Sequence, residues 1–288
     1  MRHALRVAPA FLIAVWLGAA TAAPTVEKDI EYAVVDGESM RLDLYKPATP
    51  GPLLVYLHGG AWENGNKSGM PLAALVEHGY AIASVEFRPA SKSPFPGQVH
   101  EIKAAIRFLR SQAGRFGYDA SRIGIVGASS GGHLAAVVGT SNGMPELEGA
   151  LGDHDGESSA VQAIVSYFGA SNLTTILPQS TPFGLRVREP ALQRLLGSAP
   201  ADNEALAKLA SPVFQVDGND PPLFLLHGDQ DPQMPINQSH ELQGAYEKAG
   251  LPAEFIVVHG AAHGGDAFYA PRNNERVAAF LDATLRDR

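Results

Sequence analysis

The chain contains no cysteine, which excludes disulfide bonds, thiolate catalysis and the cysteine-ligated types of zinc site. Charged residues make up only 18% of its 288 residues, the formal net charge is −8, and lysine and arginine form no cluster. Because nucleic-acid-binding proteins usually carry a basic patch, we expect no nucleic-acid partner. Hydrophobic residues reach 45%, which is enough for one large core and predicts a single globular domain.

A long apolar stretch occurs only at the N-terminus, where it has the order of an export signal. Arg2 and Arg6 give a positive start, an apolar run follows over 7–17, and Ala20-Thr21-Ala22 matches a cleavage site. The run is too short for a good transmembrane helix, although an uncleaved anchor is the alternative. We therefore predict a signal peptide over 1–23 and a secreted or periplasmic domain over 24–288. No stable membrane insertion is expected after cleavage.

The rest of the chain shows short apolar runs separated by helical patterns. Two extended runs, 31–35 and 39–44, are joined by Asp36-Gly37, which predicts an antiparallel hairpin. Continuous apolar strands alternating with helices predict an α/β fold, in which a mostly parallel sheet has helices on both faces. The expected strands lie at 53–57, 82–85, 122–126, 163–167, 223–227 and 255–258, and the expected helices at 70–78, 99–109, 131–139, 236–249 and 273–285.

The most informative motif is Gly127-Ala128-Ser129-Ser130-Gly131, which follows the strand 122–126 and precedes a helix. G-x-S-x-G between a strand and a helix is the pattern of a nucleophile elbow. Ser129 occupies the central position and is the predicted nucleophile, with Ser130 as the alternative. The motif alone is common by chance. Its weight comes from three further pieces that occur in the expected order along the chain, namely 58–62, Asp231 and His263.

Serine needs a base that removes its proton and a carboxylate that orients the base. The chain order Ser–Asp–His that goes with a nucleophile elbow favours Asp231 and His263. His263 stands on a glycine-rich loop between the last strand and the last helix, whereas the alternative His259 lies at the strand end. Asp231 lies further along its turn than the alternative Asp229, so it is the better placed to reach the base.

Acyl transfer also needs backbone N–H groups that stabilise the oxyanion. His58-Gly59-Gly60-Ala61-Trp62 follows the strand 53–57, and glycine permits close approach to a substrate. We predict that the N–H groups of Gly60, Ala61 and Ser130 form this oxyanion hole. His58 and Trp62 are expected to brace the loop, and Trp62 is also a candidate substrate contact.

The segment 168–222 is long, rich in proline and without a clear strand. Because long insertions in compact domains often shape binding sites, we predict that it lies over the active site. Phe168 and Phe183 are its candidate substrate contacts, and a plain surface excursion is the alternative. A long uninterrupted helix, as in a mobile lipase lid, is not expected, because prolines interrupt the segment at Pro178, Pro182 and Pro190.

The motif segments 58–62, 127–135, 227–231 and 262–264, with 95–107 and 210–213, resemble α/β-hydrolases near the hormone-sensitive-lipase-like esterases. The nearest resemblance is to the bifunctional feruloyl and acetyl xylan esterase type, BD-FAE, and it runs from about Tyr32 to Leu285. It implies the α/β-hydrolase fold, the same triad and the same oxyanion hole. The family often has a third glycine at Ala61 and an alanine at Ser130, and backbone donors survive both changes.

The sequence therefore predicts an exported serine carboxylesterase that cleaves short acyl or aryl esters through an acyl-enzyme. Acetyl or feruloyl groups on plant polysaccharide are candidate substrates. An arylformamidase or amidase with the same triad is the alternative, because kynurenine formamidases share the H-G-G-x-W form, and a silent binding protein is a distant third. No cofactor or metal is expected, since Asp153-His154-Asp155-Gly156 lacks the remaining spacing of a calcium loop.

Overall fold

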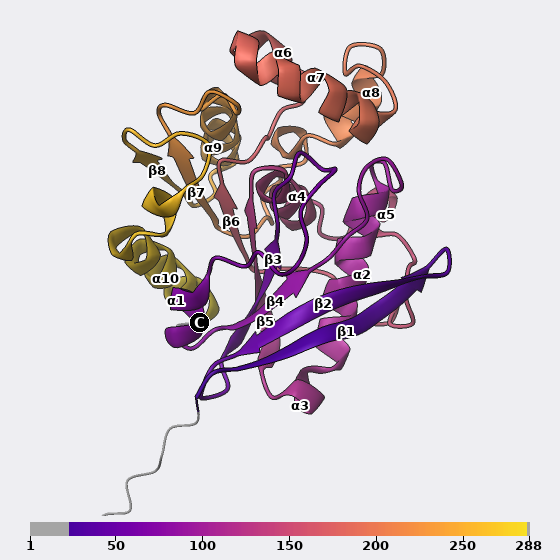
Figure 1. Cartoon of the computed structure of the whole chain (residues 1–288), viewed down its shortest axis with the longest axis vertical. Coiled ribbons are helices and arrows are strands. Elements are labelled where there is room, and N and C mark those ends of the chain that lie inside the picture. The colour runs from indigo at the N-terminus through magenta and orange to yellow at the C-terminus, as the bar shows by residue number, and fades with distance from the viewer. Residues whose placement is uncertain (1–22, 287–288) are drawn as a thin grey trace, which may run out of the picture.

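The computed structural model describes residues 23–286, so the predicted signal peptide lies outside the described residues apart from Ala23. An eight-stranded sheet forms its centre, in the order β1-β2-β4-β3-β5-β6-β7-β8 (Figure 1). The strands are β1 (Thr25–Val35), β2 (Glu38–Lys46), β3 (Pro52–Leu57), β4 (Ala81–Val85), β5 (Asp119–Ala128), β6 (Ala163–Tyr167), β7 (Leu223–Gly228) and β8 (Ala253–Val258).

The N-terminal hairpin forms the antiparallel part of the sheet. β1 and β2 pair antiparallel, β2 pairs antiparallel with β4, and the pairs from β4 through β3 to β8 are parallel. Asp36 and Gly37 join β1 to β2 with φ angles of 52° and 80°, the positive values that a tight hairpin requires. The predicted α/β architecture, including the hairpin, is confirmed.

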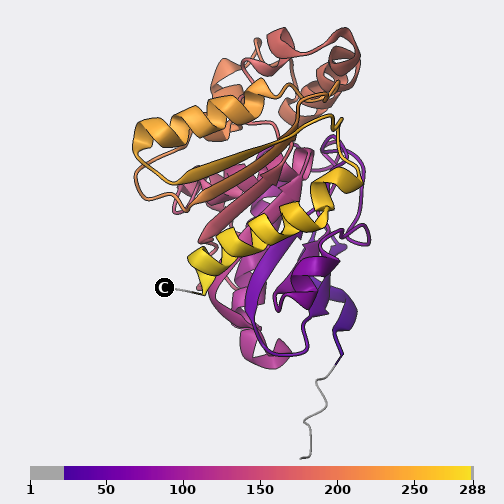
Figure 2. The ribbon, with the colours of Figure 1, turned by 90° about the vertical axis from the view of Figure 1, so that its left-hand side faces the viewer.

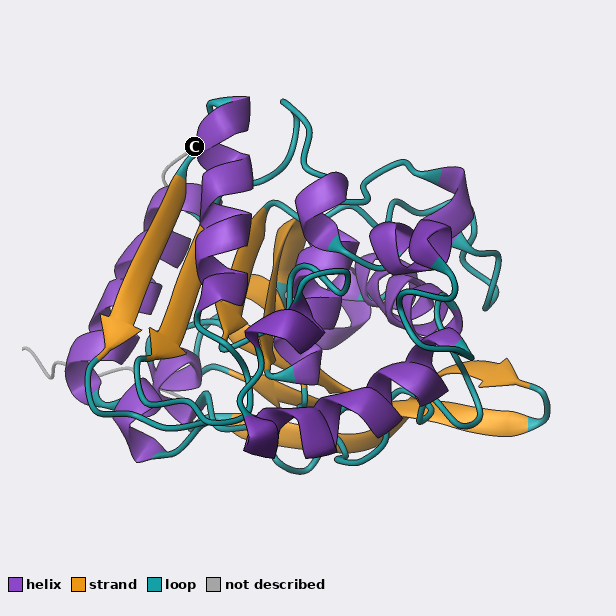
Figure 3. Ribbon diagram, turned by 90° about the horizontal axis from the view of Figure 1, so that it is seen from above, coloured by secondary structure: helices purple, strands orange, loops and turns teal. Residues whose placement is uncertain are grey.

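Helices cover both faces of the sheet (Figures 2 and 3). On one face, residues of α1 and α10 share a hydrophobic cluster with Leu54 and Tyr56, and on the other, residues of α2, α4 and α9 share a cluster with Leu53 and Val55. No described helix is long and apolar enough to cross a bilayer. The helices outside the 168–222 insertion are α1 (Ala73–Glu77), α2 (Gly97–Ser111), α3 (Ala113–Phe116), α4 (Ser130–Gly139), α5 (Pro145–Glu148), α9 (Asn237–Ala249) and α10 (Pro271–Leu285), with the 3-10 turn η2 (Asp266–Tyr269). A further 3-10 turn, η1 (Pro212–Phe214), lies inside the insertion.

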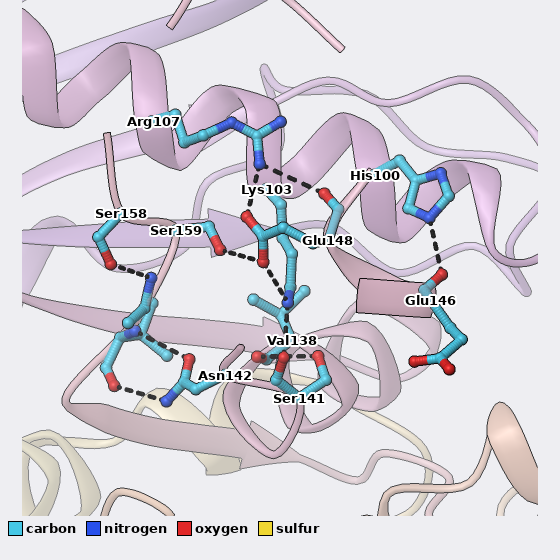
Figure 4. Close-up of polar contacts among 12 residues, drawn as sticks. His100, Lys103, Arg107, Val138, Ser141, Asn142, Glu146, Glu148, Ser158 and Ser159 are labelled. Carbon is cyan, nitrogen blue, oxygen red and sulfur yellow. Dashed lines mark hydrogen bonds and ion pairs between the residues drawn. The ribbon is translucent and has the colours of Figure 1, made fainter. Parts of the chain in front are cut away.

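Buried charges hold α2, α5 and the end of α4 together (Figure 4). Lys103 and Arg107 of α2 are almost fully buried and bind the carboxylate of Glu148 at 3.0 and 2.6 Å. Lys103 also donates to the carbonyl of Ser141, just after α4, at 2.7 Å. Removing one partner of a buried ion pair leaves an uncompensated charge and costs about 3–5 kcal/mol. The cluster therefore fixes the layer to which α4 belongs.

The insertion between β6 and β7 carries α6 (Ile176–Gln179), α7 (Pro182–Leu196) and α8 (Glu204–Leu209), which lie together above α4 in Figure 1. The prediction that prolines prevent a long helix here is wrong, because α7 has 15 residues. Pro182 lies in the first turn, where no N–H donor is needed, and Thr181 caps the helix by accepting the N–H of Gly184 at 3.0 Å. Pro190 lies on the exposed side and does not end the helix.

Candidate active site

Ser129 lies alone between the end of β5 and the start of α4. Its φ of 56° and ψ of −120° form a strained conformation for a residue with a side chain, as in a nucleophile elbow. A Cβ at Gly127 would lie 2.1 Å from the carbonyl oxygen of Gly131, and a Cβ at Gly131 would lie 2.2 Å from a backbone oxygen of β3. Only glycine fits at these two positions, which explains the motif.

The structure brings Ser129, His263 and Asp231 into one hydrogen-bonded row. The Oγ of Ser129 is 2.8 Å from Nε2 of His263, and Nδ1 of His263 is 2.6 Å from Oδ2 of Asp231. The carboxylate is 1% exposed and the imidazole 11%, so the row is shielded from water. With its proton on Nδ1, the imidazole can accept the serine proton at Nε2.

Two loop amides and two histidines surround the carboxylate of Asp231. Its Oδ1 accepts the N–H groups of Gln233 and Met234, both at 2.8 Å. Burial alone raises the pKa of Asp231, but hydrogen bonds from His227, His263 and the backbone outweigh burial and hold that pKa well below its usual range. Asp231 is therefore ionised at neutral pH and can stabilise the imidazolium that forms during catalysis.

The alternative base and acid pair with each other instead of joining the row. His259 Nδ1 is 2.8 Å from Oδ2 of Asp229, whose Oδ1 accepts the N–H of Gly260 at 2.7 Å. This pair ties the turn after β7 to the loop that leads to His263. The alternative nucleophile, Ser130, has a buried Oγ without a hydrogen-bond partner in the described part of the chain.

The predicted oxyanion loop follows β3. Gly60 and Ala61 have φ angles of 129° and 54°, and a Cβ on Gly60 would lie 2.0 Å from the carbonyl oxygen of Asn64. Within residues 23–286, neither Gly60 nor Ala61 donates its N–H in a hydrogen bond. Ser130 is the first residue of α4, where N–H groups have no acceptor within the helix. The geometry thus leaves three donors available beside Ser129, and their role in oxyanion binding stays a prediction.

Trp62 braces this loop as predicted by its place in the motif, and a substrate contact by Trp62 stays a prediction. Its side chain is only 1% exposed and its Nε1 donates to Nδ1 of His133 at 3.0 Å. His133 in turn donates from Nε2 to the carbonyl of Ala210 in the insertion at 2.7 Å. The indole is held inside the core because its only polar atom has this buried partner.

His133 should make a contribution to the free energy of unfolding that is lost in acid, because its imidazole is buried in the neutral form. Burial lowers the pKa of His133 to about 4, so the unfolded chain takes up the proton first, near pH 6.5. The contribution is fully present above pH 6.5 and is lost as the pH falls towards 4. Relative to His133→Gln, which does not titrate, the wild-type free energy of unfolding should fall by about 3 kcal/mol across this window. Urea unfolding at several pH values measures it, and equal pH dependence of the two proteins would contradict it.

Two further residues position the site, and sequence reasoning missed both. Gln98 is fully buried and donates from Nε2 to the carbonyls of Trp62 and Arg88, at 2.9 and 2.8 Å. His227, also fully buried, has Nε2 3.0 Å from the carbonyl of Met234 and 3.4 Å from Oδ2 of Asp231. Gln98 thus fixes the oxyanion loop and His227 the loop of the acid. In the sequence, the one indication that His227 supports the acid is that it is the first residue of the motif His227-Gly228-Asp229-Gln230-Asp231.

The two phenylalanines predicted as substrate contacts have different surroundings. The Phe168 ring is 5% exposed and packs edge-on against the imidazole of His263, with ring centroids 4.9 Å apart. It therefore supports the base. Phe183 is 54% exposed in the first turn of α7, next to the point where Thr181 donates to the carbonyl of Pro232 at 2.6 Å. Substrate contact by Phe168 or Phe183 stays a prediction.

Comparison with known families decides the classification. The BD-FAE family model matches residues 42–246. The chain belongs to the BD-FAE family. The matched stretch contains the oxyanion loop, Ser129 and Asp231, and His263 follows it.

Relatives of this BD-FAE protein carry esterase names. Esterase LipQ of Mycobacterium tuberculosis is 31% identical over 90% of this chain and 59% of its own length, so the chain spans less than two thirds of LipQ. A truncated carbohydrate esterase from gut microbiota is 31% identical with a TM-score of 0.82, covering 92% of this chain and 98% of that one. Esterase 2 of Thermogutta terrifontis with bound propionate is 26% identical with a TM-score of 0.72, covering 92% and 96%. This BD-FAE protein is therefore an α/β-hydrolase of the esterase type.

Proposed function

We propose that this BD-FAE protein is a serine carboxylesterase that hydrolyses short acyl esters through an acyl-enzyme. The observation that carries the proposal is the row from Ser129 Oγ to His263 at 2.8 Å and on to Asp231 at 2.6 Å. The elbow conformation of Ser129 and the three available N–H donors beside it complete the set that acyl transfer requires.

In the first half of the reaction, Oγ of Ser129 bonds to the ester carbonyl carbon while Nε2 of His263 takes the hydroxyl proton. The carbonyl oxygen becomes an oxyanion that the N–H groups of Gly60, Ala61 and Ser130 stabilise. The carbon–oxygen bond to the alcohol then breaks, and His263 returns the proton to the leaving alkoxide. In the second half, water loses a proton to His263, attacks the acyl-enzyme and releases the acid, and Ser129 regains its proton.

The proposed substrates are acetyl or feruloyl esters of plant polysaccharide outside the cell. The structural neighbour from gut microbiota is named a carbohydrate esterase, and the Thermogutta terrifontis esterase was observed with propionate bound. The first name supports a carbohydrate ester and the second a small acyl group. An extracellular or periplasmic location agrees with the predicted export signal over 1–23 and is part of this proposal.

We expect turnover to be fastest for acetyl to butyryl esters, with no activation by a lipid–water interface. The Thermogutta terrifontis esterase was observed with propionate bound, which supports a short acyl group, and Thr181 and Arg188 tie the insertion to the loop that carries Asp231. Each additional methylene of the acyl chain should raise the activation free energy by about 1–3 kcal/mol, so kcat/KM should decline gradually with chain length. The measurement is kcat/KM for p-nitrophenyl acetate, butyrate and octanoate.

Three further substrates make this experiment decisive. A methyl ferulate reaction tests the aryl ester. Faster turnover of an emulsified long-chain triglyceride than of the acetyl ester would replace the proposal by a lipase. Faster cleavage of an arylformamide than of any ester would replace it by a formamidase.

A further inference from the structure

Helix α7 carries one charged residue on its buried face. The buried residues of this helix are Gly184, Arg188, Ala191, Leu192, Leu195 and Leu196. The side chain of Arg188 is 1% exposed, although arginine is seldom fully buried without a partner of opposite charge. Neither the proposed mechanism nor the fold accounts for a buried guanidinium at this position.

The donors of Arg188 are mostly unused. Its Nε donates to the carbonyl of Gln233 at 3.3 Å, whereas its buried Nη1 has no hydrogen-bond partner among the residues that the structure describes. The carboxylate of Asp231 acts on Arg188 electrostatically, but the oxygens of that carboxylate already bind two loop amides and His263. A guanidinium has five N–H donors and keeps its charge in proteins, so it strongly favours a further acceptor.

Arg188 lies beside the loop that carries Asp231. Its Nε donates to the carbonyl of Gln233, and the N–H of Gln233 donates to Oδ1 of Asp231 at 2.8 Å. Burial lowers the pKa of Arg188 to about 10 while Asp231 raises it, so the side chain is a cation at neutral pH. A ligand that pairs with Arg188 would therefore lie beside the acid of the hydrogen-bonded row that also holds His263 and Ser129.

We propose that Arg188 is the recognition residue of an anion subsite, and that the preferred ester carries a carboxylate close to its scissile bond. Arginine binds carboxylate through two parallel N–H donors, and the unpartnered Nη1 supplies one of them. The carboxylate belongs either to the acyl part, as in a monoester of a dicarboxylic acid, or to the alcohol part, as in an acetylated hydroxy acid. This inference rests on the proposed esterase function and narrows its substrate class.

The test compares charged and neutral esters of nearly the same shape. For the acyl side, p-nitrophenyl hemisuccinate is compared with its methyl ester, and for the alcohol side, acetoxyacetate is compared with acetoxyacetamide. The proteins are wild type, Arg188→Met, Arg188→Lys and Arg186→Met, the last replacing an exposed arginine of the same helix as the matched control. Circular dichroism and thermal unfolding establish that each variant is folded.

In wild type, we expect kcat/KM to favour the charged ester of one pair by about ten- to hundredfold, the usual effect of a hydrogen bond to a charged group. Arg188→Met should remove this preference, Arg188→Lys should keep part of it, and Arg186→Met should leave it unchanged. The pair that shows the preference identifies the side of the ester. An absence of preference in wild type, or equal losses on both members of a pair in Arg188→Met, would show that Arg188 only supports the loop of Asp231.

A binding measurement separates this inference from the proposed function. Monomethyl succinate and acetoxyacetate are titrated calorimetrically into Ser129→Ala and into Ser129→Ala with Arg188→Met. Binding of either compound by Ser129→Ala, and not by Ser129→Ala with Arg188→Met, supports the anion subsite. If wild type at the same time cleaves no ester, the esterase proposal is contradicted and the anion subsite is not. Equal affinity of the two proteins, or no binding by either, overturns the anion subsite and leaves the esterase proposal standing.

Discussion

Replacing Ser129 by alanine should reduce kcat for p-nitrophenyl acetate by about six orders of magnitude, the effect seen when the nucleophile of subtilisin is removed. Alanine has the same Cβ as serine, so the strained φ of 56° is no more difficult for it to adopt and the fold should persist. Steady-state kinetics give the loss, and circular dichroism with thermal unfolding shows that the variant is folded.

Ser130→Ala is the matched control for this experiment. The Oγ of Ser130 is buried without a partner in the described structure, and the backbone N–H that we assign to the oxyanion hole survives the substitution. We expect this variant to keep at least about a tenth of wild-type kcat, since a single hydroxyl outside the row does little. If Ser130→Ala were the inactive protein and Ser129→Ala the active one, the nucleophile would be assigned to the wrong serine.

Asp231→Asn should lower kcat by about four orders of magnitude, as the corresponding change does in trypsin. The amide can still accept the N–H groups of Gln233 and Met234, so the loop should keep its shape. It can no longer provide the negative charge that selects the Nδ1–H tautomer of His263 and stabilises the imidazolium. The loss should therefore appear in kcat much more than in KM.

Asp229→Asn is the control for the acid. Asp229 pairs with His259, whose side chain is 84% exposed, and exposed pairs of this kind contribute little because water screens them. A fall in kcat of no more than about tenfold is expected. Equal losses in Asp229→Asn and Asp231→Asn would mean that the two carboxylates act as a unit, contrary to the geometry.

The strands were predictable because a parallel sheet buries both of its faces. In β3, Leu53 and Val55 contact one hydrophobic cluster and Leu54 and Tyr56 the other, so the whole strand is apolar. β5 begins at Asp119, three residues before its predicted start. Asp119 and Ser121 are polar and exposed, and the single buried Ala120 between them gives no apolar run.

Helix α7 was not predictable from its prolines. Proline is unfavourable inside a helix but suits the first turn, and the sequence alone does not show which of the two positions Pro182 occupies. The helix is stabilised by the packing of Leu192 and Leu195 into the core, a tertiary effect that outweighs the missing N–H of Pro190. Local propensity is a weak guide where such packing is available.

The candidate triad could be chosen from motifs and chain order, whereas its supports could not. Asp231 and Asp229 have the same chemistry two positions apart, and only the fold shows which of them faces His263. The sequence makes Trp62 a candidate substrate contact. The direction of its indole depends on a hydrogen bond to His133, which is 71 positions further along the chain, and no local sequence pattern indicates such a contact.

The insertion over 168–222 is hydrogen-bonded to neighbours of the oxyanion loop and of the acid, with a consequence for protein engineering. Ala210 is linked through His133 to Trp62 beneath the oxyanion loop, and Thr181 bonds to Pro232 beside the acid. Exchanging the whole segment for that of a relative would break both links unless the graft restores a carbonyl and a hydroxyl at these places. New specificity is better sought by changing single inward-facing positions of α7, because these leave both attachments intact.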